Sequence, residues 1–152
     1  MKKEIYLKML ICVLIFNSCS DDNEETGPIG SWNSISIILT NPFDFDGDGI
    51  EDNDAKAELP CLNHSFVLNS DGTGQYTSNL ASLAPQPSTS LYTCSLEFTN
   101  SIEWTESNGT ISIIGTQSDV AFQINIIDNN SLERILLGFN DIEEGRIIFK
   151  RQ

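Results

Sequence analysis

Basic residues are scarce in this chain. Its 152 residues include 8 lysines and arginines against 22 aspartates and glutamates, which gives a formal net charge of −14. A protein that binds nucleic acid needs clustered positive side chains to neutralise phosphates, and this sequence has no such cluster. The same deficit argues against electrostatic attraction to an anionic membrane surface. We therefore expect no nucleic-acid partner, and any membrane contact has to come from a lipid.

Histidine is nearly absent, because His64 is the only one in the chain. A transition-metal site that needs two histidines is thereby excluded. A catalytic Ser-His-Asp or Cys-His set would have to use His64, and no Gly-x-Ser-x-Gly turn is present to expose a serine. We expect His64 to be an ordinary hydrogen-bonded loop histidine, and the protein to bind rather than to catalyse.

Long helical patterns are also missing. From Gly30 onward, apolar and polar residues alternate with period two in short runs separated by turn residues, which predicts an all-β fold. Asp71-Gly72 and Asn108-Gly109 are typical hairpin turns. An antiparallel up-and-down β-barrel is favoured over a β-sandwich because closure removes exposed strand edges. The expected strands cover residues 31–39, 65–69, 74–78, 91–98, 101–106, 110–115, 120–127, 132–139 and 146–150.

Some finer expectations follow from the same alternation. In the first strand, Ile35, Ile37 and Leu39 should share one face. Residues 55–59 could form one helical turn at most, and residues 79–90, with two prolines, should form a surface loop. The aromatic residues are expected mainly in the core.

The N-terminus predicts export. A basic start is followed by a short apolar run, too brief to span a bilayer, and small Ser18 precedes Cys19 where a signal peptidase would cut. Residues 1–18 are therefore predicted to be a signal peptide. A cysteine at the first mature position resembles the lipobox of bacterial lipoproteins, in which this thiol is acylated; an ordinary signal peptide followed by an unmodified cysteine is the alternative.

Residues 19–29 are polar and acidic, and we expect them to be a flexible tether. Ser20-Asp21-Asp22 resembles the acidic signal that directs Bacteroidetes lipoproteins to the outer face of the outer membrane; a plain spacer on a periplasm-facing lipoprotein is the alternative. The rest of the chain, residues 30–152, has a length that suits one domain.

Two cysteines remain beyond the signal peptide and the anchor, namely Cys61 and Cys94. An even pair in an exported protein predicts a disulfide. Two buried free thiols are the alternative.

An acidic loop between the first two strands carries the clearest chemical signal. Its acidic residues repel one another, and a hard divalent cation relieves that repulsion. Aligned with a twelve-residue calcium loop, the chain has Gly49 at position six, where a sharp turn is needed, and the expected ligands fall at positions one, three, five, seven and nine: Asp44, Asp46, Asp48, the carbonyl of Ile50, and Asp52.

This pattern resembles the calcium loops of EF-hand, dockerin and thrombospondin type 3 repeats. It departs from them at position twelve, where Ala55 replaces a bidentate acid, and Asp54 and Glu58 are candidates to supply that ligand. We expect a structural calcium site with a dissociation constant on the order of 10⁻⁴ to 10⁻³ M. A solvated acidic loop without a metal is the alternative.

A wider resemblance covers most of residues 30–152. Gly30-Ser31-Trp32, the hairpin around Asp71-Gly72, and Trp104 followed by Asn108-Gly109 are similar to the small lipocalin-like domain of Bacteroidetes lipoproteins. The resemblance implies a calyx-shaped barrel, with Trp32 near its closed end and a possible small apolar ligand. We expect a lipid-anchored outer-membrane lipoprotein, at the cell surface or on the periplasmic face, that binds such a ligand. A calcium-stabilised surface interaction or adhesion module is the competing interpretation.

Overall fold

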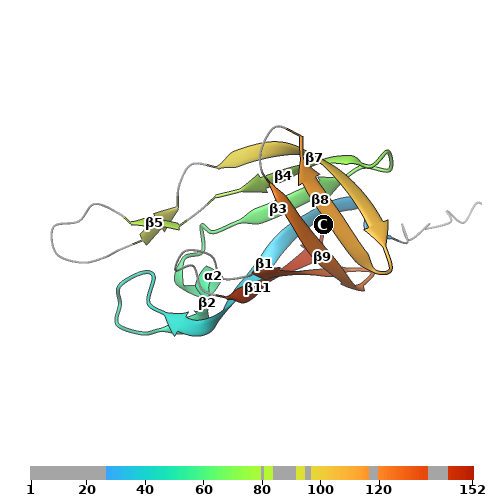
Figure 1. Cartoon of the computed structure of the whole chain (residues 1–152). Coiled ribbons are helices and arrows are strands. Elements are labelled where there is room, and N and C mark those ends of the chain that lie inside the picture. The colour runs from blue at the N-terminus through green and yellow to red at the C-terminus, as the bar shows by residue number, and fades with distance from the viewer. Residues whose placement is uncertain (1–26, 80, 84–91, 95–96, 117–119, 137–143) are drawn as a thin grey trace, which may run out of the picture.

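A computed structural model describes residues 27–79, 81–83, 92–94, 97–116, 120–136 and 144–152 (Figure 1). The predictions for the signal peptide, for Cys19 and for tether residues 19–26 fall outside these ranges. One short helix and eleven strands follow one another along the chain: β1 (Gly30–Phe43), β2 (Asp52–Asp54), α2 (Ala55–Glu58), β3 (His64–Leu68), β4 (Thr73–Ser78), β5 (Ala81–Leu83), β6 (Tyr92–Cys94), β7 (Phe98–Ser107), β8 (Thr110–Gly115), β9 (Ala121–Asp128), β10 (Ser131–Leu136) and β11 (Gly145–Arg151).

Eight of these strands close into an antiparallel barrel. Strands β1, β3, β4, β7, β8, β9, β10 and β11 pair in sequential order, and β11 returns to pair with β1 from Trp32–Arg151 to Leu39–Gly145. The up-and-down barrel is thus confirmed and the sandwich alternative is wrong. The Asn108-Gly109 hairpin turn between β7 and β8 is also confirmed. Both residues have positive φ, 52° and 77°, as a two-residue hairpin requires.

The two ends of the barrel differ. One end carries the β3–β4, β7–β8 and β9–β10 turns together with the start of β1 and the end of β11, and we call it the hairpin end. The opposite end, the loop end, carries the acidic loop, α2, and the small β5–β6 sheet. Figure 1 shows the acidic loop and β5 projecting from this same end.

Aromatic and aliphatic side chains line the interior of the barrel. The rings of Phe66 and Phe149 pack at an interplanar angle of 53° with centroids 4.7 Å apart, and at the hairpin end the Trp32 indole donates a hydrogen bond of 2.8 Å to the Pro28 carbonyl. Almost fully buried apolar side chains fill the barrel: Trp32, Phe66, Leu68, Ile102, Ile111, Ile113, Ile124, Leu132, Ile147 and Phe149. These side chains form the core of the barrel.

One face assignment in β1 was wrong. Ile37 is buried, but Ile35 is 51% exposed, while Ser34 and Trp32 point inward. The β1–β11 register shifts between Ser34 and Ser36, which marks a bulge. An extra residue reverses the alternation of the strand, so the residues on the two sides of the bulge follow different parities.

The segment between β4 and β7 also differs from expectation. Residues 79–90 were predicted to form a loop, yet Ala81–Leu83 forms β5 and pairs with β6. The strand expected over residues 91–98 is described as β6, Tyr92–Cys94, while Phe98 begins β7 and pairs with Ser78 of the barrel. The described residues of the expected strand thus belong to two different sheets.

The predicted disulfide is present. Cys61 follows α2 and Cys94 ends β6, and their sulfur atoms are bonded at 2.08 Å. The bond fastens the β5–β6 sheet to the α2 side of the loop end.

The start of the described chain is bound to the barrel. Arg151 stacks over the Trp32 ring at 4.5 Å and donates hydrogen bonds to the carbonyls of Gly27 and Ile29. Pro28 is buried. Residues 27–29, which the sequence placed in the tether, are thus part of the hairpin end. Within the described ranges, no helix has both the length and the apolar character needed to cross a bilayer.

Candidate functional site

The acidic loop brings three of its predicted ligands together. Carboxylate oxygens of Asp44, Asp46 and Asp48 all lie within 4.8 Å of one another. Oxygens that share one calcium ion at 2.3–2.6 Å are separated by at most about 5 Å. The cluster therefore has the dimensions of a cation site.

The loop is folded by its own carboxylates. Asp44 accepts hydrogen bonds from the N–H groups of Gly47 (2.6 Å) and Gly49 (2.9 Å). Gly47 and Gly49 have φ of 80° and 89°, a region that glycine enters without strain. Asp46 and Asp48 each use one oxygen to accept a hydrogen bond from the N–H two residues further on. Their second oxygens are not used in these turn hydrogen bonds.

Asp54 has a structural role instead of a place in the cluster. Its Oδ1 accepts hydrogen bonds from the N–H groups of Ile37 (2.9 Å) and Lys56 (3.0 Å), and its Oδ2 accepts one from the Ser36 hydroxyl (2.7 Å). It thus caps α2 and attaches it to β1. Of the two candidates for the last calcium ligand, Asp54 is already occupied.

Glu58, in contrast, lies near enough to the cluster for its charges to act on the Glu58 carboxyl. Desolvation raises the pKa of its carboxyl above the ordinary value, and the negative charges of Asp46, Asp48 and Asp44 raise it further, against a lowering by a hydrogen bond from the Phe45 backbone. Its Oε2 atom is shielded from solvent and has no hydrogen-bond partner among the described residues. A fourth carboxylate held near three others is the electrostatic situation that a divalent cation relieves.

The other two predicted ligands, Asp52 and the Ile50 carbonyl, are not among the three carboxylates that converge. Asp52 lies in β2, where its Oδ1 accepts a hydrogen bond from the Asp54 N–H at 2.7 Å, and its carboxylate is not one of the three that converge. The Ile50 N–H donates to Asp48, and its side chain is 67% exposed.

The acidic loop is attached to the β5–β6 sheet by aromatic contacts. Phe45 lies with its ring centroid 4.7 Å from that of Phe43 and 5.2 Å from that of Tyr92 in β6. The Tyr92 N–H donates a hydrogen bond of 3.1 Å to the Phe45 carbonyl. Order in the loop is therefore coupled to the small sheet at the loop end.

A second site lies in the barrel wall. Strands β9 and β10 pair at Asp128–Ser131, Ile126–Leu132 and Asn125–Glu133, whereas β9 pairs with β8 as far as Ala121 and β10 pairs with β11 as far as Leu136. Toward the loop end β9 and β10 separate, and a cleft of about 440 Å³ opens between them. Its lining is partly apolar and partly polar: Ala121, Phe122, Gln123, Asn125, Arg134, Ile135 and Leu136.

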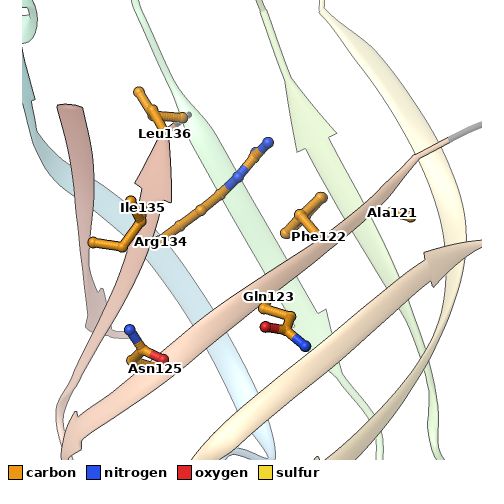
Figure 2. A pocket seen from close by; sticks show the side chains of 7 residues that line it. All are labelled: Ala121, Phe122, Gln123, Asn125, Arg134, Ile135 and Leu136. Carbon is orange, nitrogen blue, oxygen red and sulfur yellow. The ribbon is translucent and has the colours of Figure 1, made fainter. Parts of the chain in front are cut away.

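Arg134 crosses this cleft from the inner face of β10. In Figure 2 its side chain extends toward Phe122 of β9 while Ile135 points the other way. The guanidinium carbon lies 3.9 Å from the centre of the Phe122 ring, and Nη1 donates a long hydrogen bond of 3.3 Å to the Tyr76 hydroxyl. The Nε atom is buried and has no partner within the described chain.

Behind Arg134 lies a row of polar groups. The Tyr76 hydroxyl is 2.7 Å from Nδ1 of His64, and the Ser78 hydroxyl is 2.9 Å from the same nitrogen. Burial lowers the pKa of His64 to about 4, with further lowering by the positive charges of Arg134 and Lys56. His64 is therefore neutral at neutral pH. It is hydrogen-bonded as predicted, but it begins β3 instead of lying in a loop.

Comparison with protein-family models, with curated proteins and with solved structures finds no match to this chain. The all-β barrel is thus established by the structure itself, while the lipocalin-like resemblance rests on the sequence motifs.

Arg134 was not predicted as a functional residue from the sequence. Its position in the run Leu132-Glu133-Arg134-Ile135-Leu136 could have identified it. With Leu132 and Leu136 on the inner face, period-two alternation puts Arg134 on that face as well. Charged residues are rarely placed inside a small barrel without a partner.

Proposed function

We propose that this protein is a lipid-anchored, lipocalin-like binding protein of the cell envelope that takes a small apolar ligand at the β9–β10 cleft and holds a structural calcium ion in its acidic loop. The observation that carries the ligand proposal is the cleft itself. The barrel wall opens where β9 and β10 lose their pairing, beside Phe122 and Leu136. Small-molecule sites are usually concave and largely apolar with a few placed polar groups.

The acidic loop supports the calcium part of the proposal. Asp44, Asp46 and Asp48 would hold the ion, and Glu58 would supply the acid that is missing at position twelve. Calcium would neutralise the repulsion among these carboxylates and keep the loop ordered against β6. The expected role of the ion is structural, because the acidic loop and the residues that line the β9–β10 cleft belong to different parts of the chain.

The envelope location is supported by the N-terminal sequence and by the disulfide. Disulfides form and persist in exported proteins, and the Cys61–Cys94 bond fits such a compartment. Cys19 is the proposed site of lipidation, and the outer membrane, at the cell surface or on the periplasmic face, is the proposed location.

One feature favours the alternative of a surface interaction module. Ile50 at the tip of the acidic loop is 67% exposed and Phe43 is 36% exposed, so the loop presents apolar side chains to solvent. In this alternative the ordered loop contacts a partner protein and the cleft stays without a ligand.

Dye binding separates the two functions. The mature chain, residues 19–152, is prepared with Cys19→Ala so that no acyl chain competes, and it is titrated with the neutral apolar dye N-phenyl-1-naphthylamine. A binding protein should give a saturable rise in dye fluorescence, weakened by Leu136→Asn in the cleft and unchanged by Ile127→Asn, which replaces a 57% exposed residue of β9. No saturable rise, or equal weakening by both substitutions, would reject the cleft as the binding site.

A further inference from the structure

We propose that the ligand of the β9–β10 cleft carries a carboxylate, which binds the guanidinium of Arg134 while the apolar part of the ligand lies against Phe122 and Leu136. This inference deepens the proposed ligand-binding function and rests on it. It assigns a chemical class, an amphiphilic carboxylic acid, to a site that the sequence motifs alone do not define.

The first step is that Arg134 has no acidic partner in the described part of the chain. The ion pair found there joins Arg146 of β11 to Glu133, with 3.5 Å between nitrogen and oxygen. Arg134 contacts a phenyl ring and a tyrosine hydroxyl, and its Nε is left without a hydrogen bond. Arg134 is partly buried, with its Nε shielded from solvent. A shielded donor without a partner is costly, and so is a partly desolvated charge without a counter-ion. A bound anion would supply both the missing acceptor and the counter-ion.

The second step is that the neighbouring groups do not supply the missing negative charge. Tyr76 and Ser78 are neutral hydroxyls, and His64 between them stays uncharged because burial and the nearby cations hold its pKa at about 4. Lys56, the other cation that acts on His64, has Asp54 as its own nearby acid. Among these described groups, Arg134 is therefore the cation that lacks an acid.

The third step concerns the shape of the anion. A guanidinium presents parallel N–H donors, and a planar carboxylate accepts two of them at once. The unpartnered Nε belongs to one such pair of donors. The Tyr76 hydroxyl, already 3.3 Å from Nη1, is placed to add a third hydrogen bond. The apolar residues beside the guanidinium, Phe122 and Leu136, suit a hydrocarbon tail.

A matched pair of ligands tests the charge directly. Octanoate and octanol have chains of equal length and differ in the head group, and each is used at neutral pH to displace N-phenyl-1-naphthylamine from the mature Cys19→Ala chain. We expect octanoate to compete at least about tenfold better than octanol, which is the typical gain from a charge-assisted hydrogen bond. Arg134→Gln should remove this preference and leave octanol binding in place.

Two further variants keep the test interpretable. Arg146→Gln removes the same charge from the outer face of β11 and should leave the preference for octanoate unchanged. Arg134→Lys keeps the charge and should retain part of the preference, which a merely structural arginine would not predict. Saturable dye binding with equal competition by both ligands, or an octanoate preference that survives Arg134→Gln, would overturn the carboxylate proposal alone. Failure of the dye itself to bind would overturn the proposed function and this inference together.

Discussion

His64 gives the barrel a pH-sensitive residue. Its ring nitrogen Nδ1 lies within hydrogen-bonding distance of the hydroxyls of Tyr76 and Ser78, and its pKa is lowered from 6.5 to about 4 by burial and by the charges of Arg134 and Lys56. The unfolded chain therefore takes up a proton at this histidine more readily than the folded chain does. The stability that comes from keeping His64 neutral is complete above about pH 6.5 and is lost as the pH falls through about 4.

We therefore expect acidification from neutral pH to about pH 4 to cost the native protein roughly 3 kcal/mol through His64, a value that follows from a shift between pKa 6.5 and about 4. Denaturant unfolding at several pH values measures it. His64→Gln can still hydrogen-bond to the hydroxyls but does not titrate, so its stability should fall less over the same range. Parallel pH profiles for the native protein and the variant would contradict the assignment.

Single residues were the hardest to predict from the sequence. Leu132 and Leu136 fix the parity of β10, and that parity already places Arg134 inward. That no acid among the described residues pairs with it can be seen only in three dimensions. Ile35 was predicted on the face of Ile37 because nothing in the run 34–37 announces the bulge that reverses the alternation.

At the scale of elements, the acidic loop and α2 form one unit. Asp54 attaches α2 to β1, Glu58 at the other end of α2 lies near Asp44, Asp46 and Asp48, and Phe45 ties the loop to β6. A cation in the loop would thus act on the helix and on the small sheet as well as on the loop itself.

Calcium should stabilise this unit measurably. At a calcium concentration ten times the dissociation constant, binding to the folded state alone adds about 1.4 kcal/mol, which raises the melting temperature of a domain of this size by roughly 3 to 6 °C. Thermal melts of the mature Cys19→Ala chain in calcium and in chelator measure the shift. Asp46→Asn and Asp48→Asn should abolish it, and Glu58→Gln should reduce it.

A matched control for these variants is Glu106→Gln, which removes one negative charge from an exposed position of β7. It should leave the calcium shift intact. Identical melts with and without millimolar calcium in the native protein would show that the loop is a solvated acidic turn.

Some elements could be predicted from the sequence and others could not. The turns at Asp71-Gly72 and Asn108-Gly109 were predicted because Gly72, Asn108 and Gly109 have positive φ, which glycine and asparagine adopt most readily. The convergence of Asp44, Asp46 and Asp48 followed from their alternating spacing and from Gly49. The pair β5–β6 was missed because two three-residue strands around a proline-containing segment have no periodic pattern long enough to read.

For the whole molecule, lipidation is the prediction with the widest effect. We expect Cys19→Ala to abolish incorporation of a labelled fatty acid in cells and to leave the protein soluble or uncleaved, because the substitution removes the thiol that is the proposed site of acylation. Cys12→Ala, within the predicted signal peptide, should keep the label. Unchanged membrane retention of the Cys19→Ala protein would mean that another anchor exists.

The barrel as a whole was predictable because period-two alternation, hairpin turns and the lack of helical patterns agreed with one another. Its closure by β1 and β11 could only be favoured, since that pairing joins the two ends of the chain. No local sequence signal encodes a contact of such long separation.

The two chain ends meet at the hairpin end, so the tether leaves the barrel at the end opposite the opening of the cleft. Arg151 holds residues 27–29 there, while the β9–β10 cleft opens toward the loop end. From Cys19 to Thr26 the chain has eight residues, which extend to at most roughly 29 Å. If Cys19 carries the lipid, the tether sets how far the barrel can move from the bilayer. A ligand could then enter the cleft from the surrounding medium without passing the anchored end of the barrel.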